Sequence, residues 1–600
     1  MNVNERIEAL RQLMAERNID VYYVPNQDDH LSEEYTAAHF QCKSWLSGFS
    51  GDSGTVVVTK DFAGLWTDGR YFTQAEHELA GTCVTLMRMG QEGVPRVNLF
   101  ALEHTPKGGI LGFDGHVVSA EEAMFFARNL MVKDAHVHMS EDLTDLIWKD
   151  RPSMPREKTF LLSTEYTGES AMDKIREIRE RMAEKHADAL LLTQLEDPCW
   201  LLNIRGNDIP CTPVPYAFAL VKKDCVNYYI DESQLDDAVR KGLAEAGAVI
   251  RPYEALEEDL GAMEHQIVWT DLNKINACLY NALSKGRNEI LNSASPVEIR
   301  RACKNAVEIA NLKKAHELDG VAMVRFIKWL KENAADPEMS ELKAQNKLYA
   351  LRAEGEDYIE PSFDTIAAYK ANAAMMHYTA TESNYAMMKP EGFLLVDSGG
   401  TYKLGSTDIT RTIAVGPLTE DEKKYYTLVL KGHLGLAHAR FLHGTCGNNL
   451  DILARQPLWN IDIDYQCGTG HGVGYALSVH EGPQAVRWGI PSASRPSAIL
   501  EEGMIVTDEP GVYLPEKLGI RIENELLTVN GTKNFYGQWM HFENLTWCPY
   551  EREAIDPRYL DDETLSWINA YHKQVYEVLS PYLNAEEKEW LKKETAEITR

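Results

Sequence analysis

Five residues in the second half of the sequence have the side-chain types that bind two hard or borderline divalent metal ions. They are four carboxylates and one imidazole: Asp397, Asp408, His471, Glu509 and Glu523. Such an oxygen-rich set suits ions such as Mn²⁺ better than a zinc site built from thiolates. Four carboxylates also balance the charge of two divalent ions, whereas without metal their repulsion would force some of them to take up protons. The residue types therefore favour a dinuclear metal centre.

Asp397 and Asp408 lie in a predicted β-hairpin. Residues 393–396 are an apolar run that leads into Asp397, and the glycines that follow it predict a turn. The returning segment, residues 406–412, alternates as a strand and carries Asp408. Such a hairpin can place both carboxylates on one face, within bridging distance of a metal. Either aspartate alone would more often be an ordinary turn residue.

The other three ligand candidates have restrictive neighbours. His471 lies among four glycines, which let the backbone approach closely and orient one imidazole. Pro510 follows Glu509 directly and ends the apolar run before it. In the strand-like segment that follows, alternation places Arg521 and Glu523 on the same face. Each of these signals is weak alone, so the prediction depends on the ordered set.

The composition excludes several classes of function. The chain has 600 residues, 44% of them hydrophobic and 25% charged, as in globular proteins with sizeable cores. Its net charge of −30 repels nucleic acid and anionic membranes, so we expect neither as a partner. The N-terminus lacks the apolar core of a signal peptide, and no apolar run approaches the roughly 20 residues that span a bilayer. The ten cysteines are scattered without a Cys-x-x-Cys pair, so we expect a reduced, cytoplasmic protein.

The first 300 residues contain two related halves. A helix-like segment leads into the strand-like residues 21–24, and the same spacing recurs before residues 189–192. Further on, Trp45-Leu and Trp200-Leu predict matching turns, each followed by a hairpin. This order of elements is typical of a small α/β domain. We therefore predict a tandem duplication, with chance similarity of short motifs as the alternative.

We expect three domains, at residues 1–155, 160–305 and 306–600. Two prolines in the polar residues 151–158 predict the first linker. After the second border, apolar residues recur near 3.6 periodicity and predict a long helix. The stripe consists of Val307, Leu312, Ala315, Leu318, Val321, Val324, Ile327 and Leu330. Ser340 is the candidate N-cap of the next helix.

The ordered ligand set resembles the metallopeptidase family of methionine aminopeptidase, prolidase and Xaa-Pro aminopeptidase, which has the pita-bread fold. The resemblance is close to the three-domain, cytosolic type of Xaa-Pro aminopeptidase and covers essentially the whole chain. The motifs that carry it are Trp45-Leu-Ser-Gly-Phe, Trp66-Thr-Asp-Gly-Arg-Tyr-Phe, Pro361-Ser-Phe-Asp-Thr-Ile, Val479-His-Glu-Gly-Pro, Asp508-Glu-Pro-Gly-Val-Tyr and Gly519-Ile-Arg-Ile-Glu-Asn. It implies an α/β (α+β) fold, with two creatinase-N-like α/β domains before a pita-bread catalytic domain. Creatinase shares the fold without metals, but metal-free members do not keep all five ligands.

The resemblance also implies how the metal ligands divide their work. Asp397 would chelate one Mn²⁺, Asp408 and Glu523 would bridge the pair, and His471 and Glu509 would complete the second ion. A hydroxide held between the ions would attack the scissile carbonyl, because metal binding lowers the pKa of water toward neutrality. Glu509 would accept and relay the proton.

Three further residues match family positions on the substrate side. His377 and His480 match histidines that stabilise the developing oxyanion and contact the scissile peptide, with a purely structural role as the alternative. Arg521 matches an arginine that orients the active-site carboxylates. One position departs from the pattern: many members have histidine where this chain has Cys467. We expect this change to alter substrate handling rather than metal binding.

The implied activity is hydrolysis of the Xaa-Pro bond, which releases the N-terminal residue from peptides with proline in second position. Proline's amide has no N–H, so a peptidase that hydrogen-bonds that group fails on it. One alternative is a prolidase, an Xaa-Pro dipeptidase that usually has one N-terminal domain. Another is a non-catalytic peptide-binding protein on the same fold. Family members of this size often form homodimers.

Overall fold

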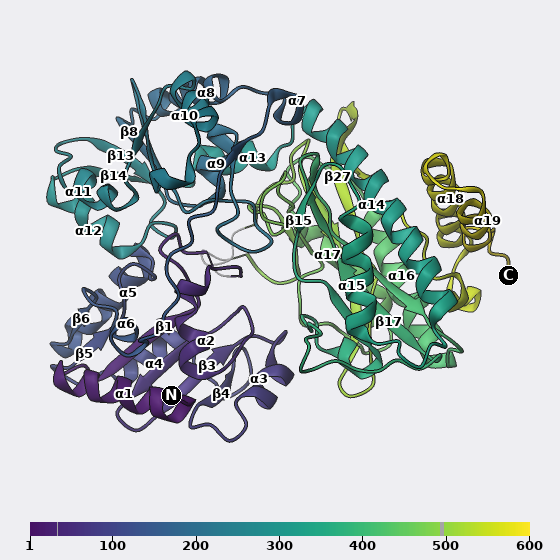
Figure 1. Cartoon of the computed structure of the whole chain (residues 1–600), viewed down its shortest axis with the longest axis horizontal. Coiled ribbons are helices and arrows are strands. Elements are labelled where there is room, and N and C mark those ends of the chain that lie inside the picture. Colours follow the sequence, from purple (N-terminus) through teal and green to yellow (C-terminus); the bar gives the residue numbers. More distant parts are fainter. Residues whose placement is uncertain (33, 492–496) are drawn as a thin grey trace. The chain divides into compact units, whose positions relative to one another are not determined.

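The computed structural model describes residues 1–32, 34–491 and 497–600 and divides into two compact units (Figure 1). The first unit consists of Met1–Thr164 and Glu169–Glu298, and the second of Glu165–Gly168 and Ile299–Arg600. In the described part of the chain, no helix combines the length and apolar character that crossing a membrane requires.

The first unit contains two six-stranded sheets with the same topology. The first has the order β4-β3-β2-β1-β5-β6, with β1 Val21–Pro25, β2 Thr55–Thr59, β3 Ala63–Thr67, β4 Thr85–Arg88, β5 Ile110–Gly112 and β6 His136–His138. The second has the order β12-β11-β10-β8-β13-β14, with β8 Ala189–Leu192, β10 Phe218–Lys222, β11 Val226–Tyr229, β12 Ala248–Arg251, β13 Ile267–Thr270 and β14 Glu289–Asn292. In both sheets the central strand is antiparallel to its hairpin neighbour and parallel to the strand on its other side. The shared topology supports the predicted duplication.

Helices of similar length precede both central strands. Helix α1 (Val3–Glu16) begins at Asn2 and α8 (Ala171–Glu184) begins at Ser170, and both caps accept a backbone N–H through their side chains. The other helices of this part are α2 Cys42–Ser47, α3 Phe72–Glu78, α4 Val97–His104, α5 Ala120–Leu130, α6 Leu143–Ile147, α9 Glu196–Leu202, α10 Asp237–Glu245, α11 Leu256–Gly261 and α12 Ala277–Lys285. Residues 151–158 have neither helix nor strand, and β7 (Phe160–Leu161) after them pairs with β9 (Ile204–Arg205).

The predicted turns at the two Trp-Leu pairs are wrong. Trp45 lies in α2 and Trp200 in α9, and each short helix turns its leucine into the core. The chain reverses only afterwards, at Gly48 and Asn203, which both adopt left-handed backbone conformations. The hairpins predicted after these pairs are confirmed by the β2–β3 and β10–β11 pairings.

The second unit begins with the long helix that the apolar stripe predicts. Helix α14 (Ala306–Asn333) starts from a capping box between Asn305 and Glu308. Ser340 caps α15 (Glu341–Arg352), as predicted, by accepting the Lys343 N–H. The remaining helices are α16 Glu420–Ala437, α17 Gly447–Trp459, α18 Asp562–Leu579 and α19 Ala585–Glu594, with α7 Thr164–Thr167 and α13 Pro296–Ala302 at the borders of the unit.

Helices α14 to α16 lie against the strands of the second unit (Figure 1). One sheet has the order β16-β17-β20, with β16 Ile366–Tyr369, β17 Phe393–Ser398 and β20 Ile409–Ala414. Another has the order β21-β28-β27-β24, with β21 Arg440–Leu442, β24 Ile505–Asp508, β27 Asn524–Asn534 and β28 Gly537–Asn544. Shorter strands complete the unit: β15 Tyr358–Pro361, β18 Gly400–Tyr402, β19 Gly405–Ser406, β22 Gly470–His471, β23 Ala485–Val486, β25 Gly511–Leu514 and β26 Leu518–Arg521.

The predicted hairpin between Asp397 and Asp408 is more elaborate than a simple turn. Strands β17 and β20 pair antiparallel, as expected, with Asp397 opposite Thr410. The connection, however, contains β18 and β19, which pair with each other, and β18 also pairs with β15. Strand β15 is distant in sequence, so the local pattern could not indicate this pairing. As a result Asp408 lies just before β20 rather than within a strand facing Asp397.

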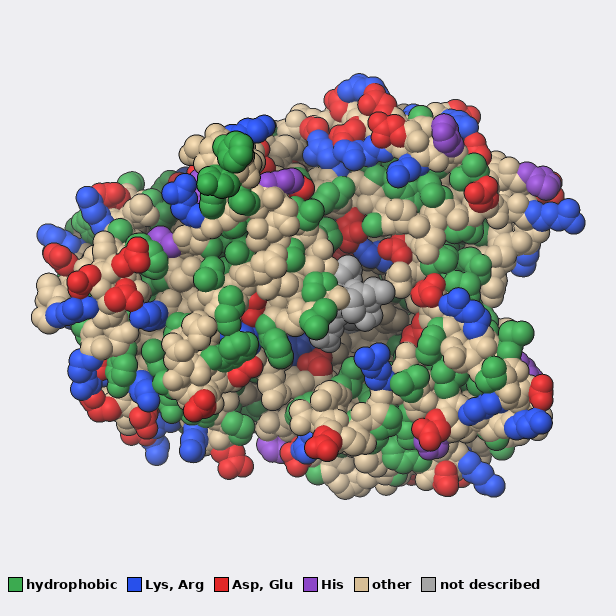
Figure 2. Space-filling view, turned by 180° about the vertical axis from the view of Figure 1, so that it is seen from behind, with side chains coloured by type: hydrophobic (Ala, Val, Ile, Leu, Met, Phe, Trp, Pro, Cys, Tyr) green, Lys and Arg blue, Asp and Glu red, His purple; other side chains and the backbone are tan. Residues whose placement is uncertain are grey.

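The excess of acidic residues does not form one continuous patch on the face that Figure 2 shows. Asp and Glu side chains alternate there with Lys and Arg. Such a mixed surface favours solubility over steering of a single charged partner.

A buried carboxylate in the first unit makes its stability depend on pH. Asp28 is fully buried and accepts the N–H groups of His30 at 3.0 Å and Ser32 at 2.8 Å and the hydroxyl of Tyr216 at 3.0 Å. Burial raises the pKa of Asp28 to about 8. A carboxyl group whose pKa is raised by folding contributes its full stabilisation below its unfolded-state pKa, near 4. This contribution to the free energy of unfolding is lost as the pH rises to the folded-state pKa, about 8.

Asp28→Asn is therefore expected to remove part of the stability loss between pH 6.5 and 8. The neighbouring His30, whose pKa burial lowers to about 3, is neutral in the folded state throughout this window, and its unfolded-state titration near pH 6.5 is common to both proteins, so it cancels in their difference. We expect the two proteins' unfolding free energies to diverge by up to about 2 kcal/mol across this window, measured by urea denaturation. The exposed Asp150→Asn is the control. Parallel curves for wild type and Asp28→Asn would contradict the assignment.

Candidate metal centre

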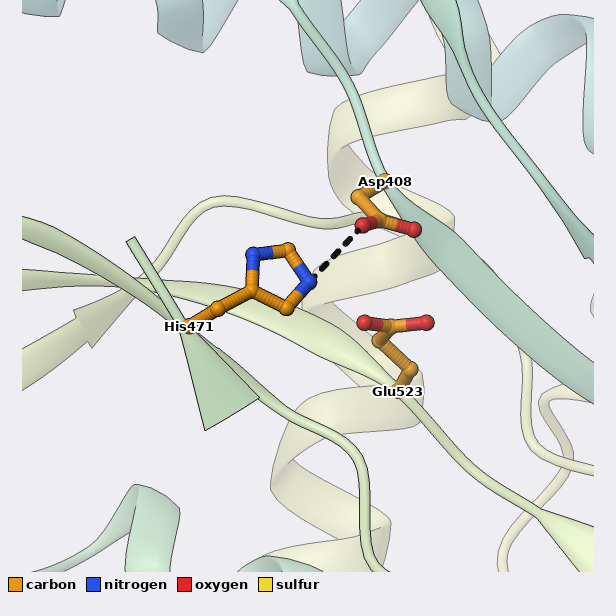
Figure 3. Close-up of side chains that lie close together, drawn as sticks. All are labelled: Asp408, His471 and Glu523. Atoms are coloured by element: carbon orange, nitrogen blue, oxygen red, sulfur yellow. Dashed lines mark ion pairs between the residues drawn. The ribbon is translucent and has the colours of Figure 1, made fainter. Parts of the chain in front are cut away.

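Asp408, His471 and Glu523 converge in the second unit although they are far apart in sequence (Figure 3). One ligand atom from each lies within 4.8 Å of the others. The carboxylates of Asp408 and Glu523 face each other, and the His471 ring points toward Asp408, with Nε2 at 3.4 Å from Oδ2. Asp408 and Glu523 are buried, whereas the His471 side chain is 20% exposed. The group therefore has an open side.

Hydrogen bonds connect the segments that carry these ligands. Glu523 lies between β26 and β27, and its N–H donates to the Thr410 carbonyl of β20 at 3.1 Å. The Thr410 hydroxyl donates to Glu523 Oε2 at 2.7 Å. The Asp408 N–H donates to Glu525 Oε1 at 2.7 Å. These bonds hold the segments that carry Asp408 and Glu523 in one arrangement.

The imidazole of His471 is oriented as in a metal ligand. Its Nδ1 lies 3.0 Å from the Gly472 carbonyl, so a neutral ring that donates there would keep a lone pair on Nε2 for a metal. Nε2 lies 3.6 Å from Glu509 Oε1. The preceding Gly470 lies so close to β24 that a Cβ would stand 1.9 Å from the Thr507 carbonyl oxygen. Only glycine allows this approach.

Asp397 lies outside the group of three and is bound by Arg521. Its Oδ2 accepts from Nη2 at 2.5 Å and from Nε at 3.1 Å. Its Oδ1 is buried, and no described residue hydrogen-bonds it. Arg521 also donates to the Thr410 hydroxyl, so Arg521 and Glu523 meet the same side chain. An orphaned buried carboxylate oxygen beside other carboxylates is a natural position for a cation.

The electrostatics of the cluster also favour cations. Burial, followed by the charge of Asp397, raises the pKa of Asp408 to about 6. Burial and the neighbouring carboxylates raise the pKa of Glu523 well above its usual range. Burial lowers the pKa of His471, but its contacts with Asp408 and Glu509 outweigh burial and raise it to about 9. Divalent ions would relieve this repulsion, so the residues present fit two such ions.

The substrate-side candidates lie around this cluster at different depths. His480 is exposed, and its ring stands 4.1 Å from that of His471. His377 is partly buried and follows Met376, whose carbonyl accepts from Arg521 Nη2 at 3.4 Å. Cys467 is partly exposed, and its carbonyl accepts from an arginine of α17.

Sequence reasoning missed several residues that support the site. Tyr513 accepts from Arg521 Nη1 at 2.7 Å, and burial raises the pKa of its hydroxyl. Glu481, next to His480, is fully buried and paired with Lys304 Nζ at 2.5 Å and Arg301 Nε at 3.4 Å. Glu481 and Tyr513 lie in two of the family motifs named above, next to His480 and near Glu509. Their positions in these motifs were therefore a signal in the sequence. Lys304 lies 177 residues from its partner and gives no local signal.

Comparison with known proteins matches every part of the chain. Models of the creatinase/prolidase N-terminal domain match residues 6–151 and 150–308. The model of metallopeptidase family M24 matches residues 310–530, and that of its C-terminal region matches residues 538–598. A probable Xaa-Pro aminopeptidase P of Paracoccidioides brasiliensis is 36% identical over the whole of both chains. The chain belongs to metallopeptidase family M24.

Another sequence relative and two solved structures support this family assignment. A probable Xaa-Pro aminopeptidase P of Laccaria bicolor is 36% identical over all of this chain and 94% of its own. The crystal structure of X-prolyl aminopeptidase from Caenorhabditis elegans, a cytosolic enzyme with a di-nuclear active site, has a TM-score of 0.94, 32% identity and complete coverage of both chains. An Xaa-Pro dipeptidase from Bacillus anthracis has a TM-score of 0.51 and 26% identity and covers 64% of this chain and 99% of its own. The fold class predicted from sequence is confirmed: creatinase N-terminal domains precede a pita-bread metallopeptidase domain.

Proposed function

We propose that this chain is a metal-dependent Xaa-Pro aminopeptidase, which releases the N-terminal residue from peptides with proline in second position. The observation that carries the proposal is the end-to-end match to the C. elegans X-prolyl aminopeptidase, both N-terminal domains included. The convergence of Asp408, His471 and Glu523 supplies the chemistry such a hydrolase needs.

The alternatives have less support. The B. anthracis dipeptidase covers only 64% of this chain, although almost all of the dipeptidase is matched. A prolidase therefore leaves much of this chain without a counterpart. A non-catalytic binding protein has no need for buried carboxylates around an open imidazole, because each of them costs stability unless a cation is bound.

We propose that the five predicted ligands hold two divalent ions, Mn²⁺ in the natural enzyme. Asp408, Glu523 and His471 would hold the ions together with Asp397 and Glu509, which lie beside that group. When bound, the ions would polarise the scissile carbonyl and lower the pKa of the attacking water. Glu509 Oε1 would accept the proton of that water and pass it toward the leaving amine.

Two histidines would contact the substrate, and one arginine would position a proposed metal ligand. His480, exposed beside His471, would hydrogen-bond the scissile peptide, and His377 would stabilise the charge that develops on the carbonyl oxygen. Arg521 would hold Asp397 in place through the two hydrogen bonds to its Oδ2. A fixed carboxylate presents its remaining oxygen in one direction, which favours a defined coordination geometry.

Several broader properties belong to the same proposal. We propose a cytoplasmic homodimer that acts on peptides and binds neither nucleic acid nor membrane. We also propose the three-domain division at residues 1–155, 160–305 and 306–600. The mixed charges on the face in Figure 2 and the acidic balance of the chain support the absence of a polyanionic partner.

A defined-metal peptidase assay tests the function. Purified protein with Mn²⁺ would receive an Xaa-Pro-Yaa tripeptide, the Xaa-Pro dipeptide and an Xaa-Ala-Yaa control, each with and without chelator. Chelator-sensitive release of the first residue from the proline tripeptide is the expected result. Cleavage of the dipeptide alone would make the protein a prolidase, and no cleavage with metal bound would favour a binding role.

Cys467→His is expected to raise kcat/KM for the proline tripeptide by roughly tenfold. An imidazole would add a hydrogen-bond donor on the substrate side, and one such donor can be worth about 10²-fold or more in a fully preorganised site. The metal content should stay unchanged, because Cys467 is outside the ligand group. The exposed Cys83→His is the control. A loss of metal in Cys467→His would contradict the substrate-side placement.

A further inference from the structure

One fully buried carboxylate in the second unit receives an unusual number of hydrogen bonds. Glu341, the first residue of α15, is 0% exposed. Its Oε1 accepts from the Tyr369 N–H at 2.6 Å and from Asn372 Nδ2 at 2.9 Å. Its Oε2 accepts from the Tyr378 hydroxyl at 2.8 Å and the Ala386 N–H at 2.6 Å. Both oxygens are therefore satisfied by the same short stretch of chain, residues 369–386.

This stretch has little regular structure of its own. It leaves β16 at Tyr369, makes a short 3-10 helix at Lys370–Ala374 and then runs as a loop to Ala386. The Glu341 N–H donates back to the Ala386 carbonyl at 3.1 Å, so α15 holds both ends of the loop. A carboxylate here replaces the backbone hydrogen bonds that a sheet would provide. Such charge-assisted bonds are stronger than neutral ones.

The opposite side of the loop rests on the metal centre. The Met376 carbonyl accepts from Arg521 Nη2, which together with Nε also donates to Asp397 Oδ2. Gly519 of β26 lies against the 3-10 helix so closely that a Cβ would stand 1.8 Å from the Ala373 carbonyl oxygen. The loop is thus fixed between β26 and Glu341. His377 lies in its middle, one residue before Tyr378.

We propose that Glu341 is a positioning residue for His377: its carboxylate sets the path of residues 369–386 and so places the imidazole beside the substrate. The inference rests on the proposed function, because it takes His377 as the group that stabilises the oxyanion. Glu341 touches neither metal ligand nor substrate in this arrangement. It acts through Tyr378, Asn372 and the two backbone N–H groups.

Glu341→Gln is the direct test. Glutamine has the same shape but replaces one acceptor oxygen by an amide donor, which must face at least one of the four donors of the loop. We expect kcat for the proline tripeptide to fall roughly 30- to 100-fold, because small misplacements of a catalytic group can cost about 10²-fold. KM should change less, and two metals per chain should remain bound. The matched control is Glu382→Gln, the same change at an exposed position of the same loop.

A double-mutant cycle separates positioning from general stability. If Glu341 acts through His377, then Glu341→Gln should cost little once His377 is alanine, when both are measured in single turnover at high enzyme concentration. The positioning role alone would be overturned by either of two results. One is that Glu341→Gln lowers kcat equally with His377 and with alanine at that position. The other is that wild type is active and Glu341→Gln has the same kcat. If Glu341→Gln does not fold, Tyr378→Phe removes one of the donors and must show the same non-additivity with His377→Ala. A wild type that cleaves no proline peptide would overturn the proposed function and this inference with it.

Discussion

Glu509→Gln is expected to abolish hydrolysis of the proline tripeptide while leaving the fold intact. Glutamine fills the same space but cannot accept a proton at Oε1, and it offers a metal only a neutral oxygen. General base catalysis typically contributes about 10²- to 10⁴-fold, so we expect kcat to fall at least 10³-fold. The Glu509 side chain is 20% exposed, so the substitution leaves no fully buried polar group unpaired.

Three measurements separate a loss of catalysis from a loss of metal or of substrate binding. The initial rate of residue release gives kcat, metal analysis gives the number of bound ions, and competition by the variant for a labelled proline peptide gives its binding. The exposed Glu516→Gln, seven residues further on, is the matched control and should keep full activity. Turnover within tenfold of wild type would remove Glu509 from its proposed role.

Glu523→Gln is expected to be more stable than wild type without metal and less stable than wild type with metal. Glu523 is buried with Asp408 and close to Asp397 and Glu509, so without cations the carboxylates repel one another. The neutral amide relieves this repulsion and can still accept from the Thr410 hydroxyl. Metal-free Glu523→Gln should therefore unfold at a higher temperature than metal-free wild type, by a few degrees for each ~1 kcal/mol.

Added Mn²⁺ should invert that order. We expect wild type to gain the binding free energy of two ions, whereas the variant has lost one of the proposed ligand carboxylates and should bind fewer. Thermal unfolding of both proteins with chelator and with excess Mn²⁺ measures the crossing. The exposed Glu553→Gln should follow wild type in both conditions. A variant that is less stable than wild type in chelator as well would show that Glu523 serves packing rather than metal.

Local patterns in the sequence were sufficient for elements whose partners are near. The apolar stripe from Val307 to Leu330 predicts α14, and Ser340 predicts the start of α15, because helix periodicity and capping depend on residues within a few positions. The hairpins of the first unit are equally local. The Trp45 and Trp200 turns were misjudged because the residues three positions later, Gly48 and Asn203, mark the true reversal.

The ligand types could be read from sequence, but their arrangement could not. Nothing near Asp397 indicates that one of its oxygens is held by Arg521, 124 residues away, while the other is buried without a hydrogen bond from any described residue. The same holds for Glu341, whose donors all come from the loop that bears His377. Contacts of this kind depend on which segments the fold brings together, and periodicity does not encode that information.

The pairing of Lys304 with Glu481 limits how the protein can be dissected. A shortened chain that starts at residue 306, the predicted border, would lack Lys304 and Arg301 and leave the fully buried Glu481 charge without a cation. Uncompensated buried charges cost about 3–5 kcal/mol, a large part of a domain's stability. Such a fragment would also lack Glu165–Gly168, whose Tyr166 carbonyl accepts from the Tyr475 hydroxyl. The peptidase half therefore cannot be expressed alone from residue 306 onward without loss of stability. A stable fragment has to retain residues that precede this border.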